Sequence, residues 1–240
     1  MPEATKSDTA PNSARHEASR MIAFSDGVVA IAITLLILPL AAIDLPLDDP
    51  AARANPLIWV YQHNEALILG FVISWFVILV FWLAHHRIFG GIAKINNEII
   101  RWNALWLFAV VVLPFPTNLV SQTDRYDAAS RPIVAFYIFT MLFMSAMLAL
   151  IGLETRRNPD LLTAEARAGQ DLKNPTGRRR GLLYLGYLFL LFIVALLAPP
   201  SVALYGLIGL ALLDPLNRYI ESRQAALSGA QLPPAPPAAS

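Results

Sequence analysis

Cysteine is absent from this 240-residue chain, and charged residues make up only 15% of it. The missing cysteine excludes disulfide bonds and thiolate metal sites. Soluble domains usually carry about 25% charged residues, so this deficit argues against a soluble enzyme and against a disordered chain. An excess of either charge is also lacking, with 18 Lys and Arg against 17 Asp and Glu. This balance offers no basic surface that would bind nucleic acid.

Hydrophobic residues, by contrast, make up 56% of the chain, and the mean hydropathy is +0.53. A helix needs about 20 largely apolar residues to cross the hydrocarbon core of a membrane. Six stretches qualify, the last being short: 21–43, 66–84, 102–120, 133–153, 181–197 and 201–213. Pro199 and Pro200 separate the last two and favour a tight hairpin there. The sequence therefore predicts an all-α membrane protein with six transmembrane helices.

Lysine and arginine are distributed unevenly between the two sides of such a protein. Only three lie on the side opposite the amino terminus: Arg53, Arg125 and Arg131. The other fifteen share the side of the amino terminus, which the positive-inside rule makes cytoplasmic for both termini. Residues 1–19 and 221–240 are predicted to be disordered tails around a transmembrane domain of residues 20–220. The charged loop 154–180 is interpreted as a solvated linker rather than a site that binds a regulator.

Polar side chains inside a span are costly unless they are paired, so each marks a candidate functional site. Ser25 and Asp26 lie within the first span, and Arg20 precedes Asp26 by about 9 Å of helical rise. Candidate partners carry indole, imidazole or amide nitrogens at a similar depth in the next two spans: Trp82, His85, His86 and Asn103. The residues of the second span could instead form an interfacial belt of aromatic and basic side chains.

An apolar stripe follows the polar pair in the first span. Ile31, Leu35 and Leu38 are spaced i, i+4 and i+7 along one face of the helix, with Thr34 beside them. A stripe of this kind usually faces lipid or packs in the core, so the pattern alone assigns it no function. Pro39 follows at once, and we expect the helix to kink or end there, which leaves the role of Leu38 open.

Three runs in the first half of the chain resemble the signature of the transmembrane protein 175 family: Arg20-x-x-x-Phe24-Ser25-Asp26-Gly27-Val28, Phe81-Trp82-x-x-His85-His86-Arg87-x-Phe89, and Asn103 through Pro114-Phe115-Pro116-Thr117. Members of this family are potassium-permeable channels, endolysosomal in animals and shorter in bacteria and archaea. The resemblance is close over the first three spans, whereas the remaining spans match in number and length only.

The resemblance implies a homotetrameric channel in the plasma (inner) membrane of a prokaryote, with the first helix of each subunit lining a central pore. It would conduct potassium and other monovalent cations, and protons could follow through water. Ile31 would be the narrowest constriction, Leu35 and Leu38 would continue it, and Thr34 would add a polar layer that bears on selectivity. A supporting network would hold the pore helix without touching ions: Arg20, Phe24, Ser25, Asp26, Trp82, Asn103 and His85, or equally His86.

The chain lacks the Thr-Val-Gly-Tyr-Gly run that places backbone carbonyls around a dehydrated ion. Rings of Ile and Leu offer no ligands to a cation and would gate by dewetting, so we expect modest selectivity for potassium over sodium. A proton-coupled secondary transporter, with Asp26 and His85 as a proton relay, is the competing hypothesis. Enzyme activity, a cofactor and a metal site are not expected, because the chain has neither a His-Glu-x-x-His nor a Gly-x-Ser-x-Gly motif.

Overall fold

The computed structural model describes residues 9–124, 126–170, 176–207 and 209, and these residues are predominantly helical. The longer helices are α1 (Thr9–Leu35), α5 (Glu65–Phe89), α6 (Asn97–Val112), α8 (Arg131–Arg157) and α10 (Thr176–Leu197). The shorter ones are α2 (Leu38–Ala41), α3 (Pro50–Ala54), α4 (Pro56–His63), α7 (Pro114–Ser121), α9 (Ala164–Gln170) and α11 (Pro200–Gly206). The predicted all-α class is therefore confirmed.

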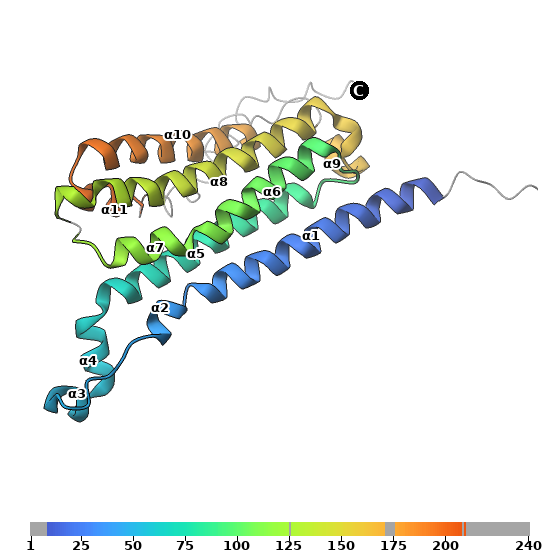
Figure 1. Cartoon of the computed structure of the whole chain (residues 1–240). Coiled ribbons are helices and arrows are strands. Elements are labelled where there is room, and N and C mark those ends of the chain that lie inside the picture. The colour runs from blue at the N-terminus through green and yellow to red at the C-terminus, as the bar shows by residue number, and fades with distance from the viewer. Residues whose placement is uncertain (1–8, 125, 171–175, 208, 210–240) are drawn as a thin grey trace, which may run out of the picture.

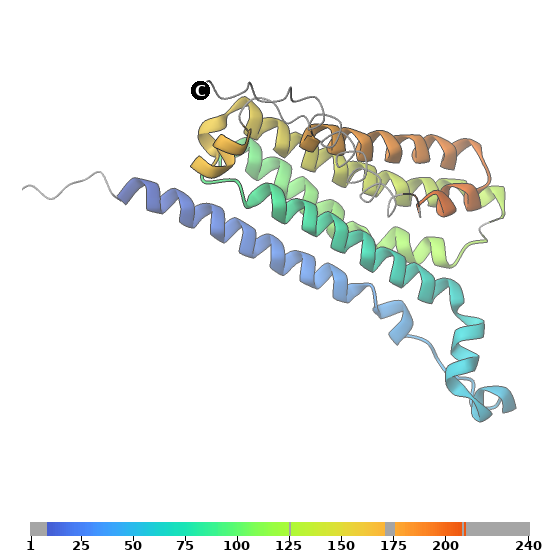
Figure 2. The same cartoon turned by 180° about the vertical axis from the view of Figure 1, so that it is seen from behind.

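The long helices lie roughly along one direction, and α1 is at one edge of the bundle (Figure 1). One side of α1 packs against α5 and α6, and α8 lies between α6 and α10. Figure 2 shows the same order from behind, with α1 again outermost. The main apolar core lies around α6 and α8, where Trp106, Ile138, Met141 and Met144 are fully buried. The bundle therefore supports α1 from one side only.

Four helical segments of the described chain are long and apolar enough to cross a membrane: His16–Ala41, Glu65–Phe89, Asn97–Ser121 and Ala128–Arg157. They coincide with the first four predicted spans. The fifth predicted span corresponds to a shorter apolar stretch, Gly181–Leu197. The sixth begins in α11 and continues into residues outside the described part, so six spans remain a prediction. The chain does turn at Pro199, and the Tyr187 hydroxyl donates a hydrogen bond to the Gly206 carbonyl across the turn, at 2.5 Å.

The first helix begins eleven residues before Arg20, at Thr9, although residues 9–19 were expected in a disordered tail. The stretch contains Ala10, Ala14, Glu17 and Ala18, which are good helix formers, so the span extends as regular helix beyond the apolar segment. Residues 9–19 of the predicted tail are therefore helical in the structure, and residues 1–8 lie outside the described part of the chain. The predicted tail of residues 221–240 lies outside the described residues.

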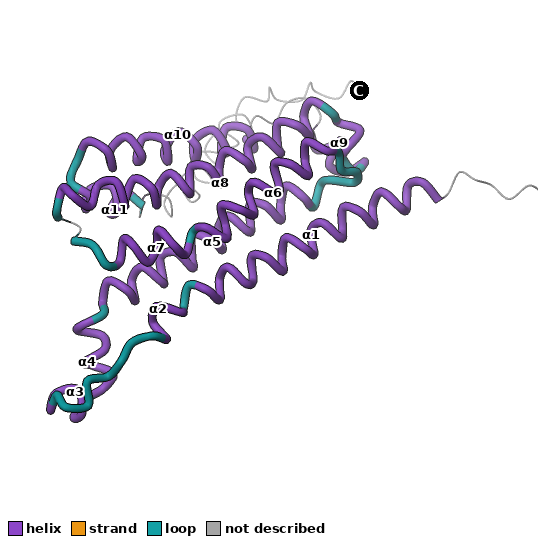
Figure 3. Tube along the Cα trace, in the orientation of Figure 1, coloured by secondary structure: helices purple, strands orange, loops and turns teal. Residues whose placement is uncertain are grey.

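Two helical connections are broken by proline, which cannot donate a backbone hydrogen bond. The chain leaves α1 at Leu35, passes through a turn and resumes as α2, which has Pro39 in its first turn (Figure 3). The third span is interrupted less, at Leu113 alone, where Pro114 opens α7 and the Leu113 and Thr117 N–H groups still bond four residues back, at 3.0 and 3.2 Å. The kink or end expected before Pro39 is confirmed.

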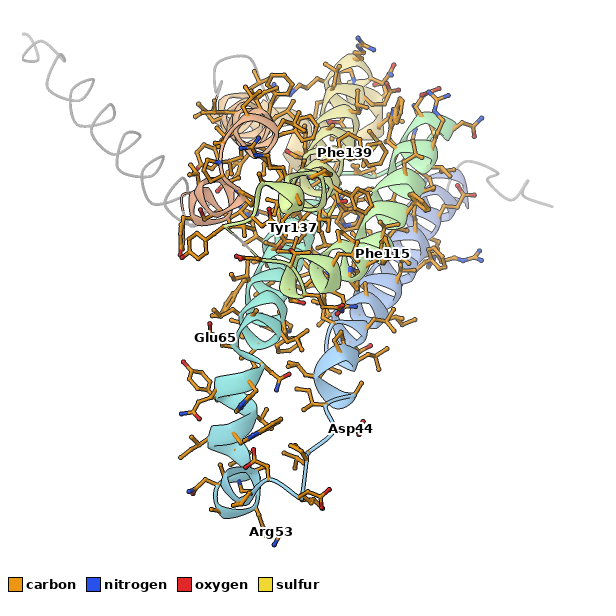
Figure 4. All side chains as sticks on the ribbon, turned by 60° about the vertical axis from the view of Figure 1, so that its left-hand side comes forward. Asp44, Arg53, Glu65, Phe115, Tyr137 and Phe139 are labelled. Atoms are coloured by element: carbon orange, nitrogen blue, oxygen red, sulfur yellow. The ribbon has the colours of Figure 1, made fainter. Side chains whose placement is uncertain are left out.

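The connection between α2 and α5 forms a small folded projection that extends beyond the rest of the bundle. Figure 4 labels Asp44, Arg53 and Glu65 along it. The carboxylate of Asp49 accepts a hydrogen bond from the Ala51 N–H at 2.8 Å and another from the Trp59 indole at 3.0 Å. The Arg53 guanidinium donates to the Leu47 carbonyl, at 2.7 Å from Nη2. These contacts hold α3 and α4 together outside the apolar part of α5.

At the opposite end of the bundle, the charged loop after α8 packs against the turn between α5 and α6. The Leu161 carbonyl accepts the N–H groups of Ala93 and Lys94, at 2.7 and 3.0 Å, and the Thr163 N–H donates to the Gly91 carbonyl at 3.0 Å. Ile92 and Leu162 form an isolated antiparallel β-bridge. Residues 161–163 of loop 154–180 are therefore docked on the bundle, whereas the sequence was interpreted as a solvated linker.

Candidate functional site

The polar residues of α1 face α5 and α6, toward the amino-terminal end of α1. The indole nitrogen of Trp82 donates a hydrogen bond to Oδ1 of Asp26 at 2.7 Å, which joins α5 to α1. An indole N–H can only donate, so the carboxyl oxygen of Asp26 is the acceptor. Asp26 therefore has a partner within the subunit.

A second set of hydrogen bonds joins α1, α6 and α5 in the interior of the bundle. The Ser25 hydroxyl donates to the Met21 carbonyl at 2.9 Å, so its oxygen accepts from the Asn103 side-chain N–H at 3.0 Å. The Asn103 oxygen then lies 2.8 Å from Nε2 of His85, which must carry the proton. Ser25 and His85 have no exposed surface and Asn103 is 3% exposed, so this is a buried polar network.

The structure separates the two histidines between which the sequence could not choose. His85 is buried, and its ring is stacked between Phe89 and Trp106, with centroid distances of 4.2 and 4.3 Å. His86 is exposed and tilts against Trp82 at 5.5 Å. Trp106 was not among the predicted residues. Its spacing of three from Asn103 places both on one face of α6, and this spacing is the signal that could have found it.

Arg20 and Phe24 are not brought into these hydrogen bonds. Arg20 lies on the exposed part of α1, and the ring of Phe24 is 65% exposed. The structure therefore joins five of the predicted network residues: Ser25, Asp26, Trp82, His85 and Asn103. It places Arg20, Phe24 and His86 around this set, on exposed surface.

The predicted pore residues lie on the face of α1 that points away from the bundle. Ile31 is 61% exposed, Leu35 37% and Leu38 56%, whereas Val29, Ala32 and Leu36 on the opposite face are buried. The Thr34 hydroxyl lies on the exposed face and donates to the Ile31 carbonyl at 2.7 Å. Leu38 lies beyond the break in the helix, on α2, so it does not continue the regular stripe of Ile31 and Leu35.

Among the described residues, no group of three or more His, Asp or Glu side chains could hold a metal ion. The proton relay of the transporter hypothesis gains no support either. Asp26 is bonded to Trp82, and His85 is bonded to Asn103, so the two proposed relay groups have separate partners.

Known proteins match this architecture. A family model described as "Endosomal/lysosomal potassium channel TMEM175" matches residues 20–114. A potassium channel from Streptomyces collinus is 32% identical over 196 residues, which cover 81% of this chain and 91% of that protein. A potassium channel from Chamaesiphon minutus is 38% identical over 129 residues, or 54% of this chain and 60% of its own length.

More distant matches are found among animals and among solved structures. The human endosomal/lysosomal proton channel TMEM175 is 24% identical over 101 residues, which cover 42% of this chain and 19% of the human protein. A crystal structure described as a lysosomal potassium-selective channel TMEM175 homolog from Chamaesiphon minutus has a TM-score of 0.65 and 26% identity. The match covers 84% of this chain and 98% of that one. From its sequence motifs, its fold and these relatives, the chain belongs to the TMEM175 family.

Proposed function

We propose that the protein is a cation channel that conducts potassium and other monovalent cations, with protons able to follow through water. The observation that carries this proposal is the asymmetry of α1. Its inner face is tied to α5 and α6 through Asp26 and Ser25, and its outer face presents Ile31, Thr34 and Leu35 without cover from the subunit. A helix held in this way can present one apolar face to a central axis. The channel names of the relatives support the same function.

The narrowest part of the proposed pore is a ring of Ile31 side chains, continued by Leu35. Such a ring offers no ligands to a dehydrated cation, so the pore opens by becoming wide enough to stay wet. The Thr34 hydroxyl adds a polar layer between the two apolar rings, and we assign to it the modest selectivity for potassium over sodium. Leu38 follows the end of α1 and lies at the outer exit of the proposed pore.

The proposed assembly is a homotetramer around an axis lined by four copies of α1, in the plasma (inner) membrane of a prokaryote. Support for the assembly comes from the exposed large apolar side chains of α1 and α5, two helices that pack against each other (Figure 1). Both termini are proposed to be cytoplasmic. The amino-terminal end of α1, the α5–α6 turn and α9 share one end of the bundle, and most Lys and Arg residues belong to these connections (Figure 1).

Flux through the purified protein in liposomes under a potassium gradient tests the proposal. Replacing Ile31 with Asn adds a polar group to the constriction, which keeps it wet, so potassium flux through I31N should exceed that of wild type by about tenfold or more. Ile193 is also an exposed isoleucine of an apolar helix, α10, and I193N should leave the flux unchanged. A folded wild-type protein without potassium flux, or flux that saturates and requires a proton gradient, would contradict the channel.

A further inference from the structure

A second buried polar cluster lies in the middle of the bundle and takes no part in the network around Asn103. Ser74 of α5, Thr117 of α7 and Tyr137 of α8 meet there, and all three are buried. The Ser74 oxygen lies 2.8 Å from the Thr117 hydroxyl and 2.9 Å from the Tyr137 hydroxyl. Tyr137 is labelled at the centre of the bundle in Figure 4. Three helices are therefore joined by three hydroxyl groups.

The direction of each hydrogen bond in the cluster follows from counting protons. The Thr117 hydroxyl donates its single proton to the Leu113 carbonyl, at 2.8 Å. Its oxygen must then accept the proton of Ser74, and the Ser74 oxygen must accept that of Tyr137. The result is a one-way chain, from Tyr137 through Ser74 and Thr117 to Leu113, in which every hydroxyl proton is used.

This series of hydrogen bonds ends at the junction of α6 and α7. Leu113 caps α7 just before Pro114, and proline has no N–H with which to continue the helix. The helix α7 also lies close to α5 at Gly70. A Cβ added at this glycine would lie 3.4 Å from Cβ of Ser121 and 3.8 Å from Cγ2 of Thr117. Gly70 and Ser74 are one turn apart on the same face of α5. The series of hydroxyl groups therefore links the first turn of α7 to α5, where the two helices lie in contact.

The hydroxyl chain also lies level with the proposed constriction. The bond between Trp82 and Asp26 sets α5 against α1 at one depth. Ser74 is eight residues from Trp82 along α5, and Thr34 is eight residues from Asp26 along α1, in both cases about 12 Å toward the outer side. The three hydroxyl groups thus anchor the part of α5 that lies at the same depth as the segment from Ile31 to Leu35 and supports it.

We propose that Thr117 is a positioning residue for the pore helix. The series of hydroxyl hydrogen bonds that runs from Tyr137 to the Leu113 carbonyl holds α5 in place behind the constriction. This inference rests on the proposed channel function. The Asn103 network secures the inner half of α1, and the hydroxyl chain secures the support of its outer half. Thr117 acts through Ser74 and α5, and it touches no ion.

The decisive variant is Thr117→Val, which keeps the shape of the side chain and removes its hydroxyl. Thr140→Val is the matched control, because Thr140 is a buried threonine of α8 whose hydroxyl, among the described residues, bonds to its own helix alone, at the Phe136 carbonyl. Leu35→Cys, introduced into each background, would be the single cysteine of the chain. Its rate of modification by a water-soluble methanethiosulfonate reagent reports the position and mobility of the outer half of α1.

Thr117→Val should raise the modification rate at Leu35→Cys by about threefold. This factor corresponds to the free energy of an average interhelical hydrogen bond in a membrane, whose loss would shift the equilibrium between the closed and open positions of α1. In otherwise unaltered chains, T117V should also change potassium flux, and Thr117→Ser should restore it. Tyr137→Phe removes only the first donor and should move both readouts in the same direction, so it serves if T117V does not fold. Equal modification rates in the T117V and T140V backgrounds would overturn the proposal. If wild type carries no flux, the channel fails but the cysteine rates still decide the role of Thr117.

Discussion

The side chain of Asn103 uses both of its hydrogen-bonding ends inside the bundle. It accepts from His85 and donates to Ser25, so one amide joins three helices. Such a residue is hard to replace, because an apolar substitute leaves the buried N–H of His85 and the Ser25 oxygen without a partner. A buried group that loses its partner costs more than the bond contributed.

Asn103→Leu should therefore lower the free energy of unfolding in detergent by about 1–3 kcal/mol. Asn118→Leu is the control, since within the described part of the chain the Asn118 side chain accepts from the exposed Gln122 amide alone. Chemical denaturation followed by circular dichroism measures both. If the two variants lose equal stability, the buried network does not stabilise the bundle.

At the residue scale the sequence predicted which residue types would meet, but not every identity. Ser25, Asp26 and Asn103 stand out because polar side chains are rare in a span. His85 and His86 are adjacent in sequence and lie about 100° apart on a helix, so the choice between them depends on the rotation of α5 against α6. The contact between the His85 ring and Trp106 of α6, at 4.3 Å, belongs to that rotation, and tertiary packing sets it.

At the scale of elements, proline decides where α1 stops. Pro39 supplies no N–H to the carbonyl of Leu35, and the amides of Leu36 and Ile37 bond three residues back, at 3.3 Å, in the tightened last turn. Pro39→Ala restores the missing donor, so α1 and α2 should merge into one helix. Amide hydrogen exchange of residues 36–42 should slow by about tenfold or more. Pro46→Ala, in the loop that follows, should leave this exchange unchanged, and an unaltered rate in P39A would contradict the role of the proline.

The projection of α3 and α4 contains the titratable group whose behaviour the structure predicts. The hydrogen bond from the Ala51 N–H lowers the pKa of the Asp49 carboxyl below its ordinary value of 3.8, and the bond from the Trp59 indole acts in the same direction. A lowered pKa means that the carboxylate stabilises the fold of the projection above pH 3.8. This contribution is lost as the pH falls from 3.8 through the lowered pKa.

We expect a change in the tryptophan fluorescence of the intact protein below about pH 4, where protonation of Asp49 weakens its hydrogen bond from the Trp59 indole. Asp49→Asn should abolish the part of the transition that comes from Trp59, and Asp48→Asn should retain it. A transition centred above pH 5 that Asp49→Asn removes would mean that the pKa of Asp49 is raised rather than lowered.

The elements were only partly predictable. Long apolar runs predict spans because the membrane requires them, and four coincide with the helices. The projection was missed because α3 and α4 are short, so no apolar periodicity accompanies them, and their order depends on the contacts of Asp49, Arg53 and Trp59. The docking of the loop after α8 depends on backbone pairing with the α5–α6 turn, which side-chain patterns do not encode.

At the scale of the whole molecule, a single subunit leaves large apolar side chains of α1 and α5 uncovered, and the proposed tetramer covers those of α1 around an axis. Light scattering of the detergent-solubilised protein should give the mass of four 26.4 kDa chains after the detergent is subtracted. A monomer that still conducts potassium would contradict the shared pore. A stable dimer would require a pore built from two copies of α1, which is too few to enclose an axis.

The early start of α1 has a mechanical consequence. From Thr9 to Leu35 the helix runs without a break, and residues 9–19 add about 16 Å of rise before Arg20 is reached. Because the helix moves as one rigid rod, a tilt or rotation applied at Thr9 also moves Ser25 and Ile31. A folded fusion partner or a rigid tag joined at this end would exert force directly on α1. A flexible glycine-rich linker should therefore separate such a partner from α1 whenever conduction is measured.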